Sequence, residues 1–399
     1  MFVEENLKTE IAGSFDVAVC GGGFGGISAA LAAARQNRRT VLFEKEFILG
    51  GLGTAGLVTI YLPLCDGCGR QVSFGIAEEL LHLSISHGAE TRLPENWLTP
   101  GGRRDSTSPR FEVQYNPQLF AILAEKLLLD AGVTLLYGTY AVGVDIRDGK
   151  IRHVVTESKS GRRAYAVGSV VDATGDCDIA ALANAPTETF KQGNLLASWY
   201  YSVGRDGYRL NTLGACDIPE TEKPAGFVTQ GLSELRFSGL SAEELSLQTC
   251  LSHSSLYNDF LKKRKADENY LPVTMATVPQ IRMTRKIRGQ YTLNHTEEHK
   301  FFPDSIGMVS NWKKRGPVYE VPFGTLYSAA VKNLICAGRC TSVSETLWDV
   351  MRVIPCCAVT GQAAGTAAAL TDDFAGLDTG LLQKKLTESG VVLHERDLP

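Results

Sequence analysis

Three glycines and one carboxylate near the start of the chain have types and spacing suited to holding phosphates and a ribose. Gly21, Gly23 and Gly26 follow a short apolar strand and precede an Ala-rich helix. Gly21 would make a tight turn, Gly23 would let the backbone approach a pyrophosphate, and Gly26 would let the helix pack on the strand. Glu44 lies 18 residues after Gly26, close to the offset of a carboxylate that binds ribose hydroxyls. The pattern predicts a dinucleotide site at the N-terminus of this helix, where N–H groups face the phosphates.

The elements around these residues have the order of a Rossmann-type beginning. An apolar strand at 15–20 runs into the glycines, a helix is expected at 27–36, and a second strand at 40–44 ends on the acidic residue. This order places the glycine turn and the carboxylate at one edge of a parallel sheet. Three adjoining residues are expected in the same site: Phe24, Gly25 and Lys45.

Three further segments favour FAD over NAD, because FAD extends past its pyrophosphate and needs more places where backbone can approach it. A second glycine-rich stretch follows the acidic strand, a later strand ends at 172–176, and a turn at 337–339 precedes a late helix. The expected contacts in these segments are Gly50, Gly51, Thr54, Ala173, Thr174, Gly175, Gly338 and Arg339.

The late helix, expected at about 355–370, carries small residues at regular intervals. Ala358, Gly361, Gly365 and Ala368 are spaced by 3, 4 and 3 positions and share one helix face. Such a face lets another backbone press against it. The alternative interpretation is a buried structural helix, since small residues also suit tight core packing.

The start of this helix also carries candidate chemistry. A reduced flavin holds negative charge near N1 and O2 of its pyrimidine ring, and a helix N-terminus supplies unpaired N–H donors for that charge. Pro355 suits the first helical position, and Arg352 just before it adds a full positive charge. We therefore expect Arg352 to be both a catalytic group and a cofactor contact, and Pro355 to lie at the cofactor.

These segments together resemble the FAD-dependent oxidoreductases of the glutathione reductase-like two-dinucleotide-binding superfamily, and particularly the bacterial FAD-dependent oxidoreductase family. The resemblance rests on the early glycines with Glu44, on 50–51, on 170–176 and on 334–370. It covers nearly the whole chain, although 186–318 matches far less specifically. It implies an FAD stretched across the first domain, with Val142 near the adenine and the turn of Gly338 and Arg339 near the flavin ribitol.

One predicted strand contains a charge among apolar residues. A period of two places Ile281, Met283, Arg285 and Ile287 on one face, which buries Arg285. A buried guanidinium needs a partner, which could be an acidic side chain, a FAD phosphate or an anionic substrate. A structural ion pair and a catalytic ligand contact both remain open for Arg285. Arg282 faces the other way and is expected to be exposed.

Other patterns are weaker. Cys65 and Cys68 have the spacing of a thiol redox pair, but they lie later in the chain than the pair of flavin disulfide reductases. His295 and His299 fit an H-x-x-E-H string in a charged stretch, which we interpret as a chance match, so no metal is expected. No second glycine motif follows a strand. Electrons would therefore pass to or from a small-molecule substrate, a nicotinamide without its own domain, or a protein partner.

Composition and charge exclude several classes of protein. The 399 residues are 44% apolar and 21% charged, as in ordinary globular proteins. Lys and Arg number 40 against 44 Asp and Glu, and the net charge of −4 offers no general attraction for nucleic acid. The start lacks the features of a signal peptide, and no long apolar run occurs, so we expect a cytoplasmic chain without a membrane span. Cysteines in apolar runs are expected to be reduced core residues. Nothing indicates the oligomeric state.

The expected fold class is α/β, with a Rossmann-type FAD-binding domain and a mixed-sheet substrate domain. The FAD domain is assembled from 1–185 and 319–372, a substrate or cap segment spans 186–318, and a tail helix lies in 373–399. The expected function is hydride transfer between flavin N5 and a small organic substrate. The alternatives are a NAD-only Rossmann dehydrogenase and a flavoprotein that serves RNA-modification or assembly partners.

Overall fold

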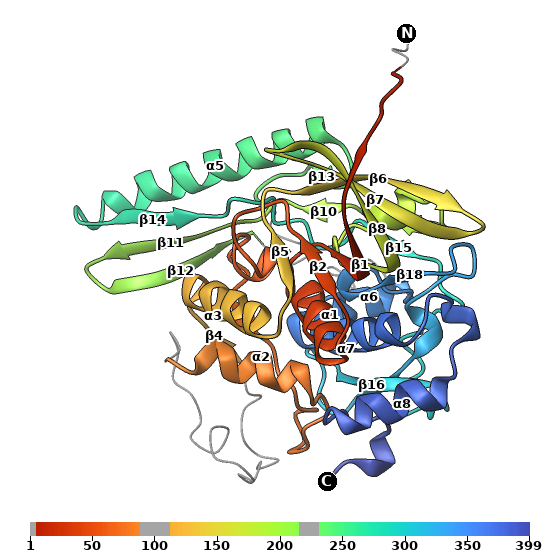
Figure 1. Cartoon of the computed structure of the whole chain (residues 1–399). Helices are drawn as coiled ribbons and strands as arrows, with labels where there is room; N and C mark the ends of the chain where they lie inside the picture. The colour runs from red at the N-terminus through yellow and green to blue at the C-terminus, as the bar shows by residue number, and fades with distance from the viewer. Residues whose placement is uncertain (1–4, 88–111, 215–230) are drawn as a thin grey trace.

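A seven-stranded sheet forms the centre of the molecule (Figure 1). The computed structural model describes residues 5–87, 112–214 and 231–399. The strands pair in the order β5 (Thr134–Leu136), β2 (Thr40–Phe43), β1 (Glu10–Cys20), β8 (Gly161–Asp172), β7 (Lys150–Ser158) and β6 (Tyr140–Arg147), and β18 (Leu334–Cys336) joins at β8. Strands β5, β2, β1, β8 and β18 are parallel, whereas β7 runs antiparallel to its neighbours. The expected α/β class is confirmed.

The side chains of β1 alternate between two layers. Val17 and Val19 pack into a helix layer, whereas Ala18 and Cys20 pack toward β6, β7 and a short helix on the other face. The helix layer contains α1 (Phe24–Arg35), α2 (Ile76–Ile85), α3 (Pro117–Asp130) and α7 (Ile354–Leu370). Because both faces are covered there, the ends of β1 and β8 that approach the glycine turn are buried, as are all four residues of β2.

Helices α1 and α7 touch through backbone atoms. A Cβ added to Gly361 would lie 2.2 Å from the carbonyl oxygen of Gly25, and one added to Gly365 would lie 2.0 Å from that of Ala29. Atoms do not approach so closely, so glycine is required at both positions. The small-residue face predicted for the late helix is confirmed, and its partner is the helix that begins at the glycine turn.

Some element bounds differ from the expected ones for clear reasons. Helix α1 begins at Phe24 rather than at 27, because the Ile27 N–H already donates to the carbonyl of Gly23 at 2.8 Å. Strand β8 is longer than the expected 167–171, because its first half pairs with β7. The expected hairpin between β6 and β7 is present, and Asp148 and Gly149 turn it with φ of 56° and 73°.

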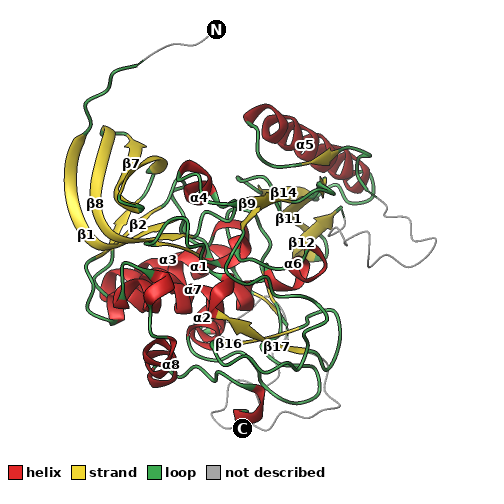
Figure 2. Cartoon of the chain, turned by 90° about the vertical axis from the view of Figure 1, so that its right-hand side faces the viewer, coloured by secondary structure: helices red, strands yellow, loops and turns green. Residues whose placement is uncertain are grey.

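The cap segment carries a small sheet and a long helix. Strand β11 (Ser198–Gly204) lies between β12 (Gly207–Leu213) and β14 (Leu271–Met275), and α5 (Ala242–Arg264) covers the sheet on the side away from the helix layer (Figures 1 and 2). The remaining elements are β3 (Ile60–Tyr61), β4 (Val113–Gln114), β9 (Thr187–Thr189), β10 (Asn194–Leu195), β13 (Arg236–Phe237), β15 (Arg285–Ile287), β16 (Ser305–Ser310), β17 (Val318–Pro322), α4 (Asp178–Leu182), α6 (Glu345–Met351) and α8 (Thr379–Glu388). The domain boundaries stay a prediction.

Within the described ranges, no single helix is both long enough and apolar enough to cross a membrane. Helices α6 and α7 reach that length and composition only as a pair, and a bend of 90° separates them.

Candidate functional site

One cavity of about 500 Å³ lies where the glycine turn, the ends of the sheet strands and the cap segment meet. This volume is in the range of sites for cofactors and small ligands. The predicted residues that line it are Gly21, Gly23, Phe24, Gly25, Glu44, Lys45, Gly50, Gly51, Ala173, Thr174, Gly175, Gly338, Arg339 and Arg352. All of these predicted residues lie outside the cap segment, so the sequence predicts part of the cavity wall on the side of the central sheet.

Five predicted residues are not part of the cavity wall: Gly26, Thr54, Val142, Pro355 and Arg285. Thr54 supports the loop from behind, since its hydroxyl donates to the carbonyl of Leu49 at 2.5 Å. Val142 follows Ala141, which does line the cavity. Gly26 and Pro355 are buried at the starts of α1 and α7. Gly26 and Pro355 therefore shape the ends of these two helices and do not form part of the cavity wall.

The glycine turn has the shape that a phosphate cradle requires. Gly21 has φ of 102°, a conformation that favours glycine. A Cβ on Gly26 would lie 1.8 Å from the carbonyl oxygen of Gly21, so the turn closes tightly on the helix. A Cβ on Gly23 would meet no atom within 4 Å, because this position faces the open cavity. The turn thus leaves space where a pyrophosphate would lie against α1, and a dinucleotide fits it.

Glu44 is held in place by the backbone around it. Its Oε2 accepts the Gly22 N–H at 2.5 Å and its Oε1 accepts the Glu46 N–H at 2.8 Å. Burial raises the pKa of Glu44, and these two hydrogen bonds oppose that shift. Each carboxylate oxygen has two acceptor directions, so both retain one for a ribose hydroxyl. Glu44 therefore ties the glycine turn to β2 and keeps acceptor capacity toward the cavity.

Charged side chains surround the part of the cavity beside Glu44. Lys45 Nζ lies 5.5 Å from the centroid of the Tyr140 ring, and both residues line the cavity. Asp176 and Asp178 line it as well. Burial and the neighbouring carboxylates Asp176 and Asp172 raise the pKa of Asp178 to about 6. This end of the site thus combines a cation with a carboxyl group whose pKa is raised.

Arg339 joins the cavity wall to the cap segment. Its Nη1 donates to the carbonyls of Ile281 at 2.8 Å and Arg282 at 2.9 Å, and its Nη2 lies 3.3 Å from Asp176 Oδ1. The turn at Gly338, with φ of 72°, presents the guanidinium to these partners. Arg339 therefore links two segments that are distant in sequence at the wall of the cavity.

Arg285 occupies a structural ion pair. Its Nη2 lies 2.8 Å from Asp178 Oδ1, and its Nε donates to the carbonyl of Asp176 at 3.0 Å. The sequence leaves open a structural ion pair and a catalytic ligand contact, and this geometry matches the ion pair. Arg285 is not among the residues that line the cavity. The expectation for Arg282 is wrong, since this residue is 5% exposed and lines the cavity. The reason is that residues 281–284 do not form part of a strand and all four are buried, so the segment has no exposed face.

Arg352 lies in the cavity wall immediately before α7. Its Nε donates to Asp349 Oδ1 at 2.8 Å, and Lys313 Nζ lies 2.5 Å from the other oxygen of the same carboxylate. Although burial opposes it, Arg352 and Lys313 hold the pKa of Asp349 below its usual value. Asp349 thus fixes the guanidinium beside the first turn of α7, where unpaired N–H groups also point.

Sequence reasoning missed the cap-side wall of the cavity. Two of the four tryptophans of the chain, Trp199 and Trp312, lie there. The Arg282 guanidinium lies 5.1 Å from the centroid of the Trp199 ring, a cation–π arrangement. Other apolar members of this wall are Val278, Pro279 and Ile281, and Val58, Ile60 and Leu62 line the cavity from the FAD-domain side. The sequence does concentrate aromatic residues in the cap segment, but this enrichment does not identify which of them line the cavity.

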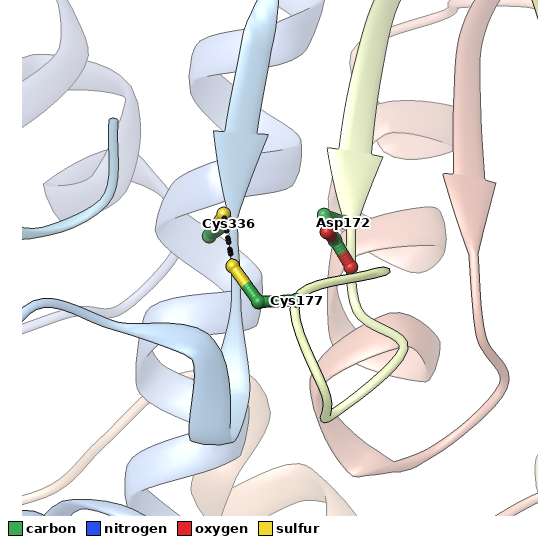
Figure 3. A group of neighbouring side chains, drawn as sticks. All are labelled: Asp172, Cys177 and Cys336. Atoms are coloured by element: carbon green, nitrogen blue, oxygen red, sulfur yellow. Dashed lines mark hydrogen bonds between the residues drawn. The ribbon is translucent and has the colours of Figure 1, made fainter. Parts of the chain in front are cut away.

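A buried cluster of thiols and one carboxylate supports the loop after β8. Cys177 Sγ lies 3.8 Å from Cys336 Sγ, next to Asp172 (Figure 3). Oδ1 of Asp172 accepts the Thr174 hydroxyl at 2.7 Å, and Oδ2 accepts the Ala180 N–H at 2.9 Å. Burial raises the pKa of Cys177, so its thiol stays protonated at neutral pH. The arrangement anchors the loop that carries Thr174 into the cavity.

The weaker motifs lie outside this cavity. Cys65 is buried and Cys68 is exposed, and every cysteine in the described part of the chain is free. His299 is exposed and its Nδ1 pairs with Glu395 Oε2 at 2.8 Å. None of Cys65, Cys68, His295 and His299 lines the cavity.

Comparisons with known proteins bear on the same segments. The family model for FAD dependent oxidoreductase matches residues 16–198 and 239–385, which is most of the chain and includes the whole glycine turn, the 172–176 loop and α7. No curated protein matches the chain by sequence.

Solved structures show only weak likeness. A geranylgeranyl bacteriochlorophyll reductase-like protein from Thermoplasma acidophilum is 14% identical, with 98% of this chain and 86% of that chain covered and a TM-score of 0.49. A p-nitrophenol 4-monooxygenase from Pseudomonas putida is 12% identical, with 94% and 84% covered and a TM-score of 0.48. The assignment rests on the family match and on the glycine turn that fits a dinucleotide. The chain belongs to the FAD dependent oxidoreductase family, and its cofactor is FAD.

Proposed function

We propose that this enzyme transfers a hydride between flavin N5 and a carbon of a small organic substrate held at the cap-side wall. The observation that carries the proposal is that one cavity contains both the glycine turn and the apolar wall of the cap segment. Gly23 and Glu44 line its cofactor part, whereas Trp199 and Trp312 line the cap side. Bound FAD supplies a two-electron acceptor or donor.

Arg352 and the start of α7 would stabilise negative charge at the end of the cavity away from Glu44. Arg352 is buried to 7% side-chain exposure, and Asp349 fixes its orientation. A fixed guanidinium in a site with little water acts more strongly than one in bulk solvent. The unpaired N–H groups of the first turn of α7 would act in the same direction.

The apolar residues of the cap-side wall would exclude water from the reacting carbon. Val58, Ile60 and Leu62 line the cavity from the FAD-domain side, and Trp199 lines it from the cap segment. A wall of this kind holds an apolar substrate body and prevents proton leakage during transfer. Electrons would then leave through a second substrate, a nicotinamide or a protein partner.

An anaerobic screen tests the proposal. The FAD-loaded protein is mixed with a panel of small alcohols, amines and organic acids, and the visible flavin absorbance is followed. We expect at least one compound to bleach it, and deuterium on the reacting carbon to slow the bleaching. The chemically reduced protein is tested in the same way against the corresponding oxidised compounds. An FAD-loaded protein that reacts with neither panel, or a bleaching rate that deuterium does not change, contradicts the proposal.

A matched pair of variants locates the chemistry. Arg352→Lys keeps the charge but removes the planar guanidinium, so we expect slower flavin reduction with FAD content unchanged. Arg147→Lys changes an exposed arginine of β6 and should leave the rate at the wild-type value. If both variants reduce the flavin at the wild-type rate, Arg352 has no part in the reaction.

A further inference from the structure

Helix α5 lies on the outside of the cap segment, and one of its faces has no partner in the described chain. Figures 1 and 2 show it as the outermost layer over β11 and β14. Its inner face is well held: Gln248 is buried, and Asp259 accepts the Tyr200 hydroxyl at 2.5 Å. The helix has 23 residues and is about 34 Å long at 1.5 Å per residue.

The outer face of α5 carries a coiled-coil type of spacing. Seven exposed residues are separated by 4, 3, 4, 3, 4 and 3 positions, which is the a/d pattern of a heptad repeat. The seam consists of Glu243, Leu247, Cys250, Ser254, Tyr257, Leu261 and Arg264. Leu247, Tyr257 and Leu261 are 48%, 58% and 42% exposed. The outer face of α5 thus exposes three large apolar side chains in one row along the helix.

The charges at the two ends of this seam are opposite. Glu243 is at the N-terminal end, and the run Lys262 to Lys265 is at the C-terminal end. If two copies of α5 lie antiparallel about a two-fold axis at Ser254, Glu243 of one copy faces Lys265 of the other. The same axis places Leu247 opposite Leu261. These two pairings, one of opposite charges and one of leucines, are those of an isologous antiparallel contact.

Exposed apolar residues gather around the same part of the chain. Among described residues, 21 large apolar side chains are exposed, and 11 of them lie between Val203 and Met275. A seam about 34 Å long and about 10 Å wide covers roughly 340 Å² per copy, or roughly 680 Å² in total, which is below the roughly 1,000 Å² of a stable interface and suits a weak, transient one. Leu235 and Leu240, just before α5, are 50% and 37% exposed and can extend it. The expected contact is one that depends on protein concentration.

We propose that the outer face of α5 is the interface of a homodimer, in which the two α5 helices pack antiparallel about a two-fold axis near Ser254. The occupant of the seam is a second copy of this chain. The proposal is independent of the hydride-transfer proposal, because no seam residue lines the cavity.

The first test is the mass in solution as a function of concentration, measured by light scattering or sedimentation of the FAD-loaded protein. The wild type should approach twice the chain mass of 43.2 kDa as its concentration rises. Leu261→Glu buries a charge in the seam and should raise the dimer dissociation constant at least tenfold. Leu129→Glu is the control, because Leu129 lies on α3 with a similar exposure of 53%. Unfolding temperature and FAD content show that each variant is folded.

The second test uses the charges at the ends of the seam. Glu243→Lys places like charges opposite each other in the antiparallel dimer and should weaken it. The double variant Glu243→Lys with Lys265→Glu restores opposite charges and should restore dimerisation. A parallel pair or an unrelated protein bound to α5 would not be rescued in this way, so lack of rescue contradicts the antiparallel arrangement.

The third test is a disulfide at the axis. In a Cys250→Ser background, Ser254→Cys should form a covalent dimer under mild oxidation, since the two side chains meet at the axis. Ser246→Cys is the matched control on the same helix, because its two copies would be about 24 Å apart along the seam. A protein that is monomeric at every concentration overturns the proposal. A dimer that survives Leu261→Glu and forms no link at Ser254→Cys overturns it as well.

Discussion

Gly23 is the position where one methyl group tests the cofactor site without disturbing the protein. Its φ of −69° and ψ of 179° are open to any residue, and a Cβ there meets no atom within 4 Å. Gly23→Ala should therefore leave the apoprotein folded. The loss of freedom in the unfolded chain should even add about 0.4–1 kcal/mol to its stability.

The same methyl group occupies space that the cofactor needs. Gly23 lines the cavity at the start of α1, where the backbone is expected to approach the pyrophosphate. Inserting a methyl group into a close-packed contact costs about 1–3 kcal/mol. The dissociation constant of FAD should accordingly rise about 5-fold to about 160-fold.

Two measurements separate the effects. Urea unfolding of the apoprotein gives its stability, and quenching of flavin fluorescence on titration gives the FAD affinity. Gly365→Ala is the control with the opposite expectation, because its Cβ would lie 2.0 Å from the Ala29 carbonyl oxygen and should lower apoprotein stability. A Gly23→Ala protein that binds FAD as tightly as the wild type refutes the close approach at this residue.

Three further predictions follow from the charged groups around the cavity. Glu44→Gln should weaken FAD binding by about 1.5–3 kcal/mol, which is the usual contribution of a hydrogen bond to a charged group. If the variant retains FAD on dialysis as well as the wild type does, Glu44 does not bind the cofactor. Because the pKa of Asp178 is raised from 3.8 to about 6, the folded chain holds this proton more tightly, and apoprotein stability should fall as pH rises from about 4 to about 6. Asp178→Asn should shrink that fall in urea unfolding, and an unchanged pH profile would contradict the shift. Arg285→Lys should lower melting temperature and FAD loading together, since it loses part of the contact with Asp178 and Asp176, while turnover per bound flavin stays constant. A variant that binds FAD fully but turns over more slowly would contradict this prediction and indicate that Arg285 takes part in the reaction.

The cofactor side of the site is predictable because it depends on neighbours in sequence. The turn at Gly21 and the opening at Gly23 follow from the backbone demands of a strand that passes directly into a helix. The small face of α7 follows from helical spacing, although the sequence does not say that Gly361 meets Gly25. Such features depend on residues that are close together in the sequence, so they can be predicted from a short stretch of the chain.

The substrate side is not predictable in this way, because contacts between distant segments decide it. Arg282 is buried since the side chain of Asn194 accepts its N–H at 3.2 Å and also the N–H of Met283 at 3.0 Å. These bonds hold the segment against β10 although no strand assigned in the described ranges includes residues 281–284, and all four residues are buried, so a period of two does not separate an inner from an outer face. Trp199 comes from a strand more than a hundred residues after the glycine turn, and no local rule connects the two.

The grip of Arg339 on the cap segment has a thermodynamic consequence. The Arg339 guanidinium lines the cavity and also donates to the carbonyls of Ile281 and Arg282. A ligand that draws this side chain toward itself must weaken its hold on the cap segment, and a ligand that tightens the cap segment must change the affinity for the cofactor by the same factor. The two bindings then oppose each other, so a bound substrate analogue that tightens the cap segment should raise the dissociation constant of FAD.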